Sequence, residues 1–370
     1  MSQQPGRHPT PGVRGATLLL LGTLLSMAPL QAQDRAVQPM RPSGPWPIKT
    51  REHVDLWLHG FALVSHDTSV VPLFRRGYRD SLIVVRNVAQ RATRLDTALA
   101  SLQKTMAATP QLVNAQFYAM HFTNFGTLRV SLQLLTQVKG DVRSMRDRDQ
   151  ARMVALAANY FNGPAEREFG EQLSVALENE SQRFFHENWL QVQRTRAPVI
   201  ARADSLWRTA WFPKLAGFLR GTGQRNGEII LSPVVEGEGR TITADPTTGI
   251  SMVVTLPPSL DRTTDVLYGI VHEAVGTFAA AAVSDNITPR QKSAGAGDRL
   301  QTAAALRAGL LLLQRVLPAE AEGYARFYLR VLGKPAPTAR AVAALEAAMP
   351  LNSDILESIG RQLDLYLGGL

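Results

Sequence analysis

Apolar residues recur every three to four positions through the first half of the chain, which is the spacing of an amphipathic helix. Val54, Leu58 and Phe61 begin this pattern, and it continues to about residue 220. Pro164 suits the start of a helix, because a proline there loses no hydrogen bond. The spacing predicts one helix from about residue 51 and others over 70–106, 110–138, 143–161, 164–194 and 198–220. We therefore expect residues 49–222 to form a helical region.

The pattern changes after the segment GTGQRNG, which ends the helices at residues 221–227. Alternating, β-branched residues predict strands over 228–235, 240–244 and 250–256, with DPTTG as the turn of a hairpin. An apolar helix is expected over 263–283, after two prolines end the last strand. A glycine-bearing loop over 284–298 then precedes helices predicted over 299–316, 319–332, 336–348 and 353–368. The sequence thus predicts an α+β fold, predominantly α, in which a helical N-terminal part precedes a small β-sheet and C-terminal helices over 223–370.

The first 32 residues have the pattern of a signal peptide. Two arginines and no acid precede an apolar run over residues 16–30, which is shorter than the ~20 residues that span a membrane comfortably. We expect cleavage after Ala32 and export to the periplasm or the extracellular space. An uncleaved N-terminal anchor helix is the alternative. Residues 33–48 contain four prolines and predict a flexible lead-in.

Composition narrows the classes of protein that are compatible with this pattern. With 45% hydrophobic and 19% charged residues, the chain has enough apolar side chains to form a core. The absence of cysteine excludes disulfides, thiol catalysis and cysteine-ligated metal sites. The net charge of +9 would suit nucleic acid, but export and the scattered arginines argue against that partner. Peripheral contact with anionic lipid or polysaccharide surfaces is the alternative explanation of the charge.

The apolar helix expected over 263–283 contains the sequence VLYGIVHEAVG. In the motif H-E-x-x-H, two histidines one helical turn apart bind zinc, and the glutamate activates a metal-bound water. Here His272 and Glu273 are present, but Gly276 occupies the position of the second histidine. Tyr268 lies one turn before His272 and shares its face of the helix. A second His-Glu pair, at 186–187, is expected on the surface of a helix.

Residues 226–335 resemble the gluzincin branch of the zincin metallopeptidases, with HEAVG in place of HExxH. The resemblance implies that His272 is a metal ligand and that Glu273 is a remnant of the general base. It also implies a metal-binding glutamate on a later helix, yet residues 301–309 contain no acid. No cofactor is expected unless the protein is active, in which case it would bind zinc. Other side chains that could supply a ligand are His53, His59, His66, His121, Asp285, Asp298, Glu320 and Glu322.

Three functional hypotheses follow. In the first, the protein is an exported, non-catalytic zincin-like protein with a degenerate metal site, and it binds a peptide or protein in a cleft near Tyr268, His272 and Glu273. In the second, it is an active zinc metallopeptidase with a non-standard ligand set, with Tyr268 as an oxyanion-stabilising or ligand-orienting group. In the third, it is a helical envelope scaffold that binds anionic surfaces.

Simpler explanations of the same residues stay open beside these hypotheses. His272 would then be an ordinary helix residue without a metal, and Gly276 would only allow close packing. Glu273 would be a buried carboxylate with a raised pKa, paired with Arg299 or Arg307.

Overall fold

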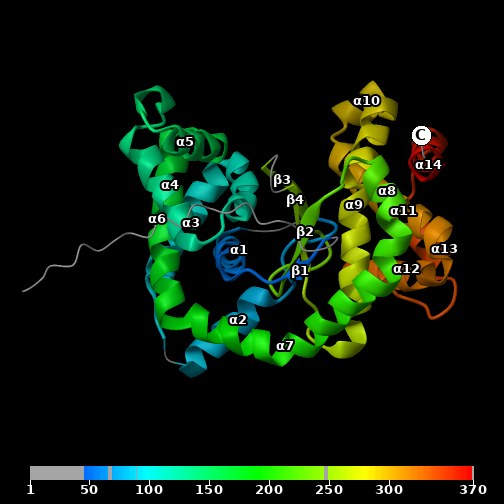
Figure 1. Cartoon of the computed structure of the whole chain (residues 1–370), viewed down its shortest axis with the longest axis horizontal. Coiled ribbons are helices and arrows are strands. Elements are labelled where there is room, and N and C mark those ends of the chain that lie inside the picture. Colours follow the sequence, from blue (N-terminus) through cyan, green and yellow to red (C-terminus); the bar gives the residue numbers. More distant parts are fainter. Residues whose placement is uncertain (1–45, 66–68, 90, 246–248, 369–370) are drawn as a thin grey trace, which may run out of the picture. The chain divides into compact units, whose positions relative to one another are not determined.

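The fold is predominantly helical and contains one four-stranded mixed sheet, which confirms the predicted fold class (Figure 1). The computed structural model describes residues 46–370 except 66–68, 90, 246–248 and 369–370. The expected signal peptide and nearly all of the expected lead-in lie outside these residues. Residues 40–370 belong to one compact unit.

The sheet has the strand order β1-β2-β4-β3. Its strands are β1 (Ile48–Lys49), β2 (Gly227–Ser232), β3 (Arg240–Asp245) and β4 (Gly249–Thr255). β2 pairs in parallel with β1 and β4, whereas β3 runs antiparallel to β4 and forms an edge of the sheet. The three predicted strands are confirmed. The sequence did not predict β1, because two residues are too few to show a period.

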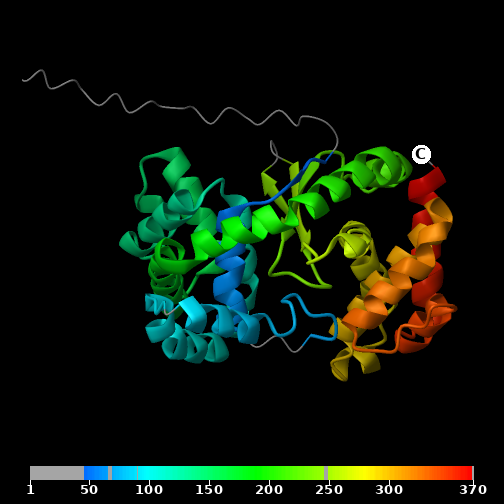
Figure 2. The same cartoon turned by 90° about the horizontal axis from the view of Figure 1, so that it is seen from below.

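Both faces of the sheet are buried. All six residues of β2 are buried, and successive side chains point to opposite faces. Ile229 and Leu231 therefore pack into one hydrophobic core, and Ile230 packs into another. The strands lie between the helices of the N-terminal part and those of the C-terminal part (Figures 1 and 2).

The N-terminal helices are confirmed, but two of the predicted helices are each divided. The observed helices, with 3-10 segments labelled η, are α1 (Glu52–Val64), α2 (Tyr78–Ala89), α3 (Arg94–Ala108), η1 (Pro110–His121), α4 (Phe125–Gln137), η2 (Val142–Ser144) and α5 (Arg148–Tyr160). The helix expected over 70–106 divides because Thr93 and Asp96 form a capping box that begins α3. The helix expected over 110–138 divides because the Asn124 side chain accepts a hydrogen bond from the Thr127 amide and begins α4.

The next two predicted helices are instead nearly continuous. They comprise α6 (Pro164–Glu180), the π-turn η3 (Ser181–Phe185), α7 (His186–Leu206), the π-turn η4 (Trp207–Trp211) and α8 (Phe212–Gly221). The break expected before residue 198 is absent, and Pro198 lies inside α7. Pro198 and Arg194 are both exposed, so the carbonyl that Pro198 leaves without a donor can be hydrated.

The C-terminal helices follow the predicted order. They are η5 (Leu260–Arg262), α9 (Thr264–Asn286), α10 (Pro289–Ser293), α11 (Gly297–Val316), η6 (Pro318–Glu320), α12 (Ala321–Val331), α13 (Ala341–Ala348) and α14 (Ser353–Gly368). The short helix α10 was not predicted and lies in the expected loop. Helix α9 is long and apolar enough to cross a membrane, but most of its apolar stretch is buried, as in a core helix.

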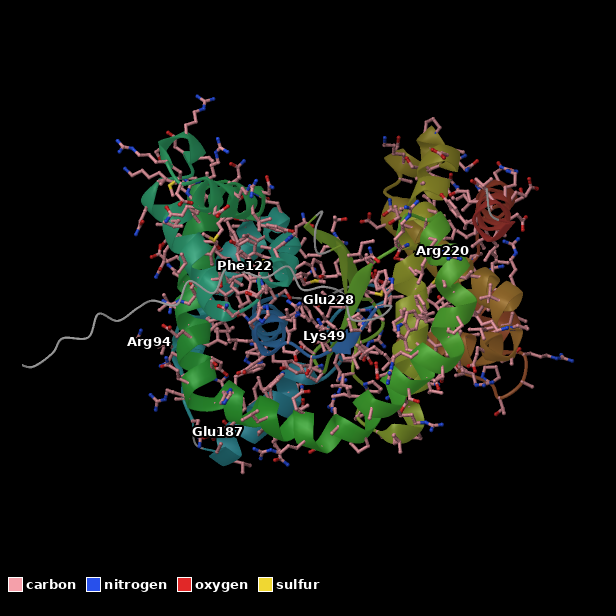
Figure 3. The ribbon with its side chains drawn as sticks, in the orientation of Figure 1. Lys49, Arg94, Phe122, Glu187, Arg220 and Glu228 are labelled. Carbon is pink, nitrogen blue, oxygen red and sulfur yellow. The ribbon has the colours of Figure 1, made fainter. Side chains whose placement is uncertain are left out.

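A group of charged side chains joins β1 and α1 to β2. The Glu228 carboxylate accepts hydrogen bonds from Arg51 at 2.6 Å and Lys49 at 3.3 Å. Arg51 also donates to the carbonyl of Phe122, and Figure 3 labels Lys49, Phe122 and Glu228 in this region. These bonds anchor the short strand β1 and position α1 against the sheet.

The burial of β2 on both faces predicts a large cost for truncating Ile230. We expect Ile230→Ala to lower the free energy of unfolding by about 2–5 kcal/mol, because it leaves a cavity in the core between the sheet and the N-terminal helices. Val130→Ala, at an exposed position of α4, should change it by less than about 0.5 kcal/mol. Denaturant unfolding followed by circular dichroism measures both, and equal effects would contradict the two-sided core.

Candidate functional site

Helix α9 places His272 beside an acid that the sequence analysis did not select. The His272 side chain is 3% exposed, and its ring packs against the ring of Tyr328 on α12, with 5.2 Å between centroids. Its Nε2 atom lies 3.2 Å from Oε2 of Glu238, which belongs to the loop between β2 and β3. The Glu238 side chain is 40% exposed, so this pair connects the interior with solvent.

The segment that precedes α2 holds the Glu238 loop in place. The backbone N–H groups of Gly237 and Glu238 both donate to the carbonyl of Pro72, and Glu236 N–H donates to the carbonyl of Leu73. The Tyr328 hydroxyl donates to the Gly237 carbonyl at 3.3 Å. These contacts fix the loop backbone on both sides of Glu238.

Two glycines allow the Glu238 loop to pack this closely. A Cβ atom on Gly237 would lie 2.4 Å from Cγ1 of Val331, and one on Gly239 would lie 2.4 Å from the Val253 carbonyl oxygen. Both distances are too short for any side chain. The sequence Gly237-Glu238-Gly239 is therefore the signal that could have identified this loop as a site element.

Glu273 is held by neutral donors from the loop and from β3. Its Oε1 atom accepts the Gly239 N–H at 3.0 Å, and its Oε2 atom accepts the Thr241 hydroxyl at 3.2 Å. Arg307 pairs instead with Glu346 at 2.8 Å, and Arg299 is exposed. The structure thus gives Glu273 hydrogen-bond donors in place of the arginine partner considered from the sequence.

Burial and neighbouring charge shift the pKa values of His272 and Glu273, which form a cluster with Glu238. Burial raises the pKa of Glu273 to about 7, although the His272 charge and the two hydrogen bonds lower it in part. Burial lowers the pKa of His272, but the carboxylates of Glu238 and Glu273 more than offset this, and the net shift is upward. Glu273 therefore titrates close to neutral pH, where an ordinary carboxyl would be fully ionised.

The cluster contains donors that a divalent cation accepts. One nitrogen of His272 and one oxygen each from Glu238 and Glu273 all lie within 4.8 Å of one another. Imidazole and carboxylate are both zinc ligands. The side chains therefore fit a cation by type and by proximity, but as a set that differs from the zincin pattern. Gly276 contributes no ligand to this set, and the space beside it is open, since a Cβ on Gly276 would meet no atom within 4 Å.

The other side chains considered as ligands are occupied elsewhere or exposed. Tyr268 donates its hydroxyl to Glu320 at 2.9 Å, and Glu322 accepts the backbone N–H of Ala341. Asp285 and Asp298 are exposed. Burial and the Glu320 charge raise the pKa of Tyr268 well above its ordinary value. Tyr268 thus serves as a hydrogen-bond donor to the start of α12.

The other histidines of the described residues bind partners outside the cluster. His53 contacts the Phe122 carbonyl, His59 lies between Tyr78 and Glu180, and His121 contacts Tyr160. His66 lies outside the described residues. His186 pairs with Glu52, and its side chain is 52% exposed, which agrees with the predicted surface position.

Two buried polar atoms near the cluster have no hydrogen-bond partner within the described structure. They are Nδ1 of His272 and the hydroxyl oxygen of Tyr324 on α12. Burial raises the pKa of Tyr324 well above its ordinary value, and the charges of Glu238 and Glu273 add to this shift. No sequence pattern indicates Tyr324, because it lies on an amphipathic helix among other aromatic residues.

A groove lies beside Glu273, between the edge strand β3 and helix α9. It is a cavity of about 420 Å³ lined by uncharged side chains, among them Thr241, Thr243, Thr277, Gln224 and Tyr366. Gln224 donates through Nε2 to the Ala274 carbonyl at 2.7 Å, which orients its amide. Its Oε1 atom is left buried without a hydrogen-bond partner among the described residues.

The raised pKa of Glu273 predicts how stability changes with pH. Between pH 4.5 and 7 the folded chain keeps a proton that the unfolded chain has lost, so the free energy of unfolding falls as pH rises. In Glu273→Gln the fall in the free energy of unfolding over this pH range should be smaller, by on the order of 2 kcal/mol. Urea unfolding at several pH values, in buffer with EDTA, measures the difference. Parallel profiles for the two proteins would show that the pKa of Glu273 is not raised.

Loss of the proton of His272 lowers the free energy of unfolding further at higher pH. Its raised pKa stabilises the fold fully below pH 6.5, its ordinary value, and this contribution disappears as pH rises through the folded-state value. Glu273→Gln leaves Glu238, the partner of His272, in place. Most of the fall in the free energy of unfolding that His272 causes should therefore persist in the variant. The two contributions can thus be separated within one set of curves.

Comparison with known proteins adds no family assignment. No family model matches the chain, and neither a curated protein nor a solved structure matches it. The zincin resemblance therefore depends on the motif residues and their setting alone.

Proposed function

We propose that this chain is a non-catalytic, zincin-like protein that binds a peptide or protein segment in the groove between β3 and α9. The observation that carries the proposal is the uncharged 420 Å³ groove beside a motif cluster whose side chains already bind one another and the backbone. The sequence of residues 1–32 further suggests that the protein is exported and acts in the periplasm or outside the cell.

The internal hydrogen bonds of the cluster argue against hydrolysis. Both Glu273 oxygens accept hydrogen bonds, from Gly239 and Thr241, which orient the carboxylate towards the β2–β3 loop and β3. His272 pairs with Glu238 instead of a second histidine. The residues of a catalytic motif thus act here as a structural link between α9 and the β2–β3 loop.

The edge strand and the groove together suit an extended ligand. β3 pairs with β4 on one side and ends the sheet on the other. An extended peptide can add to the edge of a sheet through backbone hydrogen bonds, while pockets beside that edge select its side chains. The groove contributes hydroxyl groups but no charge, so we expect it to select uncharged polar side chains.

Filling the groove should abolish peptide binding. Thr277 lines the groove from the exposed side of α9, so Thr277→Trp should fill it without disturbing the core. We expect phage-displayed random peptides that bind the full chain to lose at least about tenfold in affinity for this variant. Ser284→Trp, exposed on the same helix outside the groove, should leave binding unchanged. The proposal fails if no peptide shows this difference between the two variants.

A second candidate function is a cation-dependent hydrolase, and the proximity of the cluster donors favours it. Glu238, His272 and Glu273 would hold a divalent cation, which when bound would supply a polarised water beside the groove. In this case Glu273 would leave its bonds to the β2–β3 loop and become a ligand. The two candidates differ in whether the purified protein binds metal.

Metal content distinguishes the two functions. For the non-catalytic protein we expect well under one equivalent of zinc per chain by elemental mass spectrometry, even after incubation with excess zinc, and no change in His272→Ala. Glu346→Ala, which removes a partly exposed acid on α13, provides a control for weak surface binding. One equivalent that is retained in the control but lost in His272→Ala would establish the metal site and overturn the first function.

A further inference from the structure

Helix α2 presents an apolar face to solvent. Ile83, Val84, Val85 and Val88 are between 44% and 82% exposed, and we call these four residues the α2 apolar face. They lie on the outer side of the helix, because Leu82 and Arg86 are its buried residues. Four large aliphatic side chains on one short helix are an unusual amount of exposed apolar surface for a soluble domain.

The surroundings of this face are basic. Residues 75–94 contain six arginines and a single acid, Asp80. Arg76 is exposed, Arg79 is half-buried, and neither forms an ion pair with any described residue. Arg79 lies four residues before Ile83, so it is one helical turn away on the same side of α2. Arg79 thus places a charge without an ion-pair partner among the described residues beside the apolar face, and Arg76 lies just before the helix, where its backbone N–H donates to the Glu236 carboxylate at 2.8 Å.

Buried polar contacts fix the orientation of α2. Arg86 donates to Glu180 at 3.0 Å and to Asp96 at 2.8 Å, and the Tyr78 hydroxyl lies 2.9 Å from Nδ1 of His59. These bonds hold the inner side of the helix against α1, α3 and α6. The apolar face is thus a preformed surface, and the helix cannot simply rotate to bury it.

We propose that helix α2 docks on the surface of an anionic lipid bilayer. The aliphatic side chains would enter the boundary between headgroups and acyl chains, and Arg76 and Arg79 would contact the phosphate groups. An interfacial helix is recognised by this combination of apolar residues and arginine. The inference is independent of the groove and its proposed ligand.

The chemistry of the face argues against the other occupants. Nucleic acid would require aromatic or hydrogen-bonding groups at the centre of the face, and the centre is aliphatic. A second copy of this chain would bring two basic segments together with a single acid, Asp80, in each. Anionic lipid satisfies both the apolar residues and the arginines at once.

The absence of cysteine allows a local test in the full chain. Val88→Cys, labelled with the environment-sensitive fluorophore NBD, should show a blue shift and at least a twofold rise in emission with vesicles of phosphatidylcholine and phosphatidylglycerol. The change should be much smaller with phosphatidylcholine alone and should weaken at high salt. The label reports only on α2, so membrane contact by residues 1–45 does not produce the signal. An unchanged emission at position 88 would overturn the proposal.

Matched controls separate docking by α2 from general attraction of a basic protein. A label at Val130→Cys, exposed on α4, should remain in water. Arg76→Gln with Arg79→Gln should weaken vesicle binding by about fivefold per arginine. Arg143→Gln with Arg146→Gln, which makes the same charge change at exposed positions elsewhere, should have little effect. Equal weakening by both pairs would overturn the proposal, as would a blue shift that follows protein concentration without vesicles.

Discussion

The burial of the sheet on both faces is the constraint on which the rest of the structure depends. Because β2 is covered on both sides, Ile229 and Ile230 belong to different cores, and the helices before and after the sheet must pack on opposite faces. The buried strand β2 leaves no open surface for a site, so the polar cluster and the groove lie towards the ends of the strands and the edge strand β3, where the Glu238 loop and the partly exposed Thr241 lie.

The Glu238–His272–Glu273 cluster shows how two acids and one histidine can be stable where the interior of the fold meets solvent. Two carboxylates at such a short distance would repel each other if both were ionised and no positive charge lay nearby. Here a raised pKa lets His272 carry that charge, and a raised pKa lets Glu273 keep a proton. Two hydrogen bonds compensate Glu273 further. Protons and hydrogen-bond donors from the loop and from β3 thus stabilise this arrangement of ionisable groups.

The sequence predicted regular elements well where a period extends over several turns or residues. The strands near 228, 240 and 250 and the helices after residue 263 were found close to their expected bounds. The prediction of helix boundaries failed where local capping competes with periodicity. At Thr93 and Asn124 a capping side chain begins a new helix. The prediction also failed at Pro198, where solvent exposure permits a proline that the sequence alone indicates as a break.

Only part of the candidate site was predicted, and the reason differs from that for the helices. His272 and Glu273 are adjacent in the chain, so a motif could identify them. Glu238 lies 34 residues before His272 and reaches it only because the loop packs against Pro72 and Tyr328. That long-range packing is invisible in local sequence, although the two glycines beside Glu238 indicate a close approach of the backbone.

The same loop joins the groove to helix α9. Gly239 and Thr241 connect the loop and the edge strand to Glu273, so the wall of the groove is connected directly to α9. Glu273 makes this connection through neutral donors, and the lining of the groove carries no charge of its own. A ligand that enters therefore meets a preformed surface of hydroxyl and amide groups, with the ionisable cluster behind it.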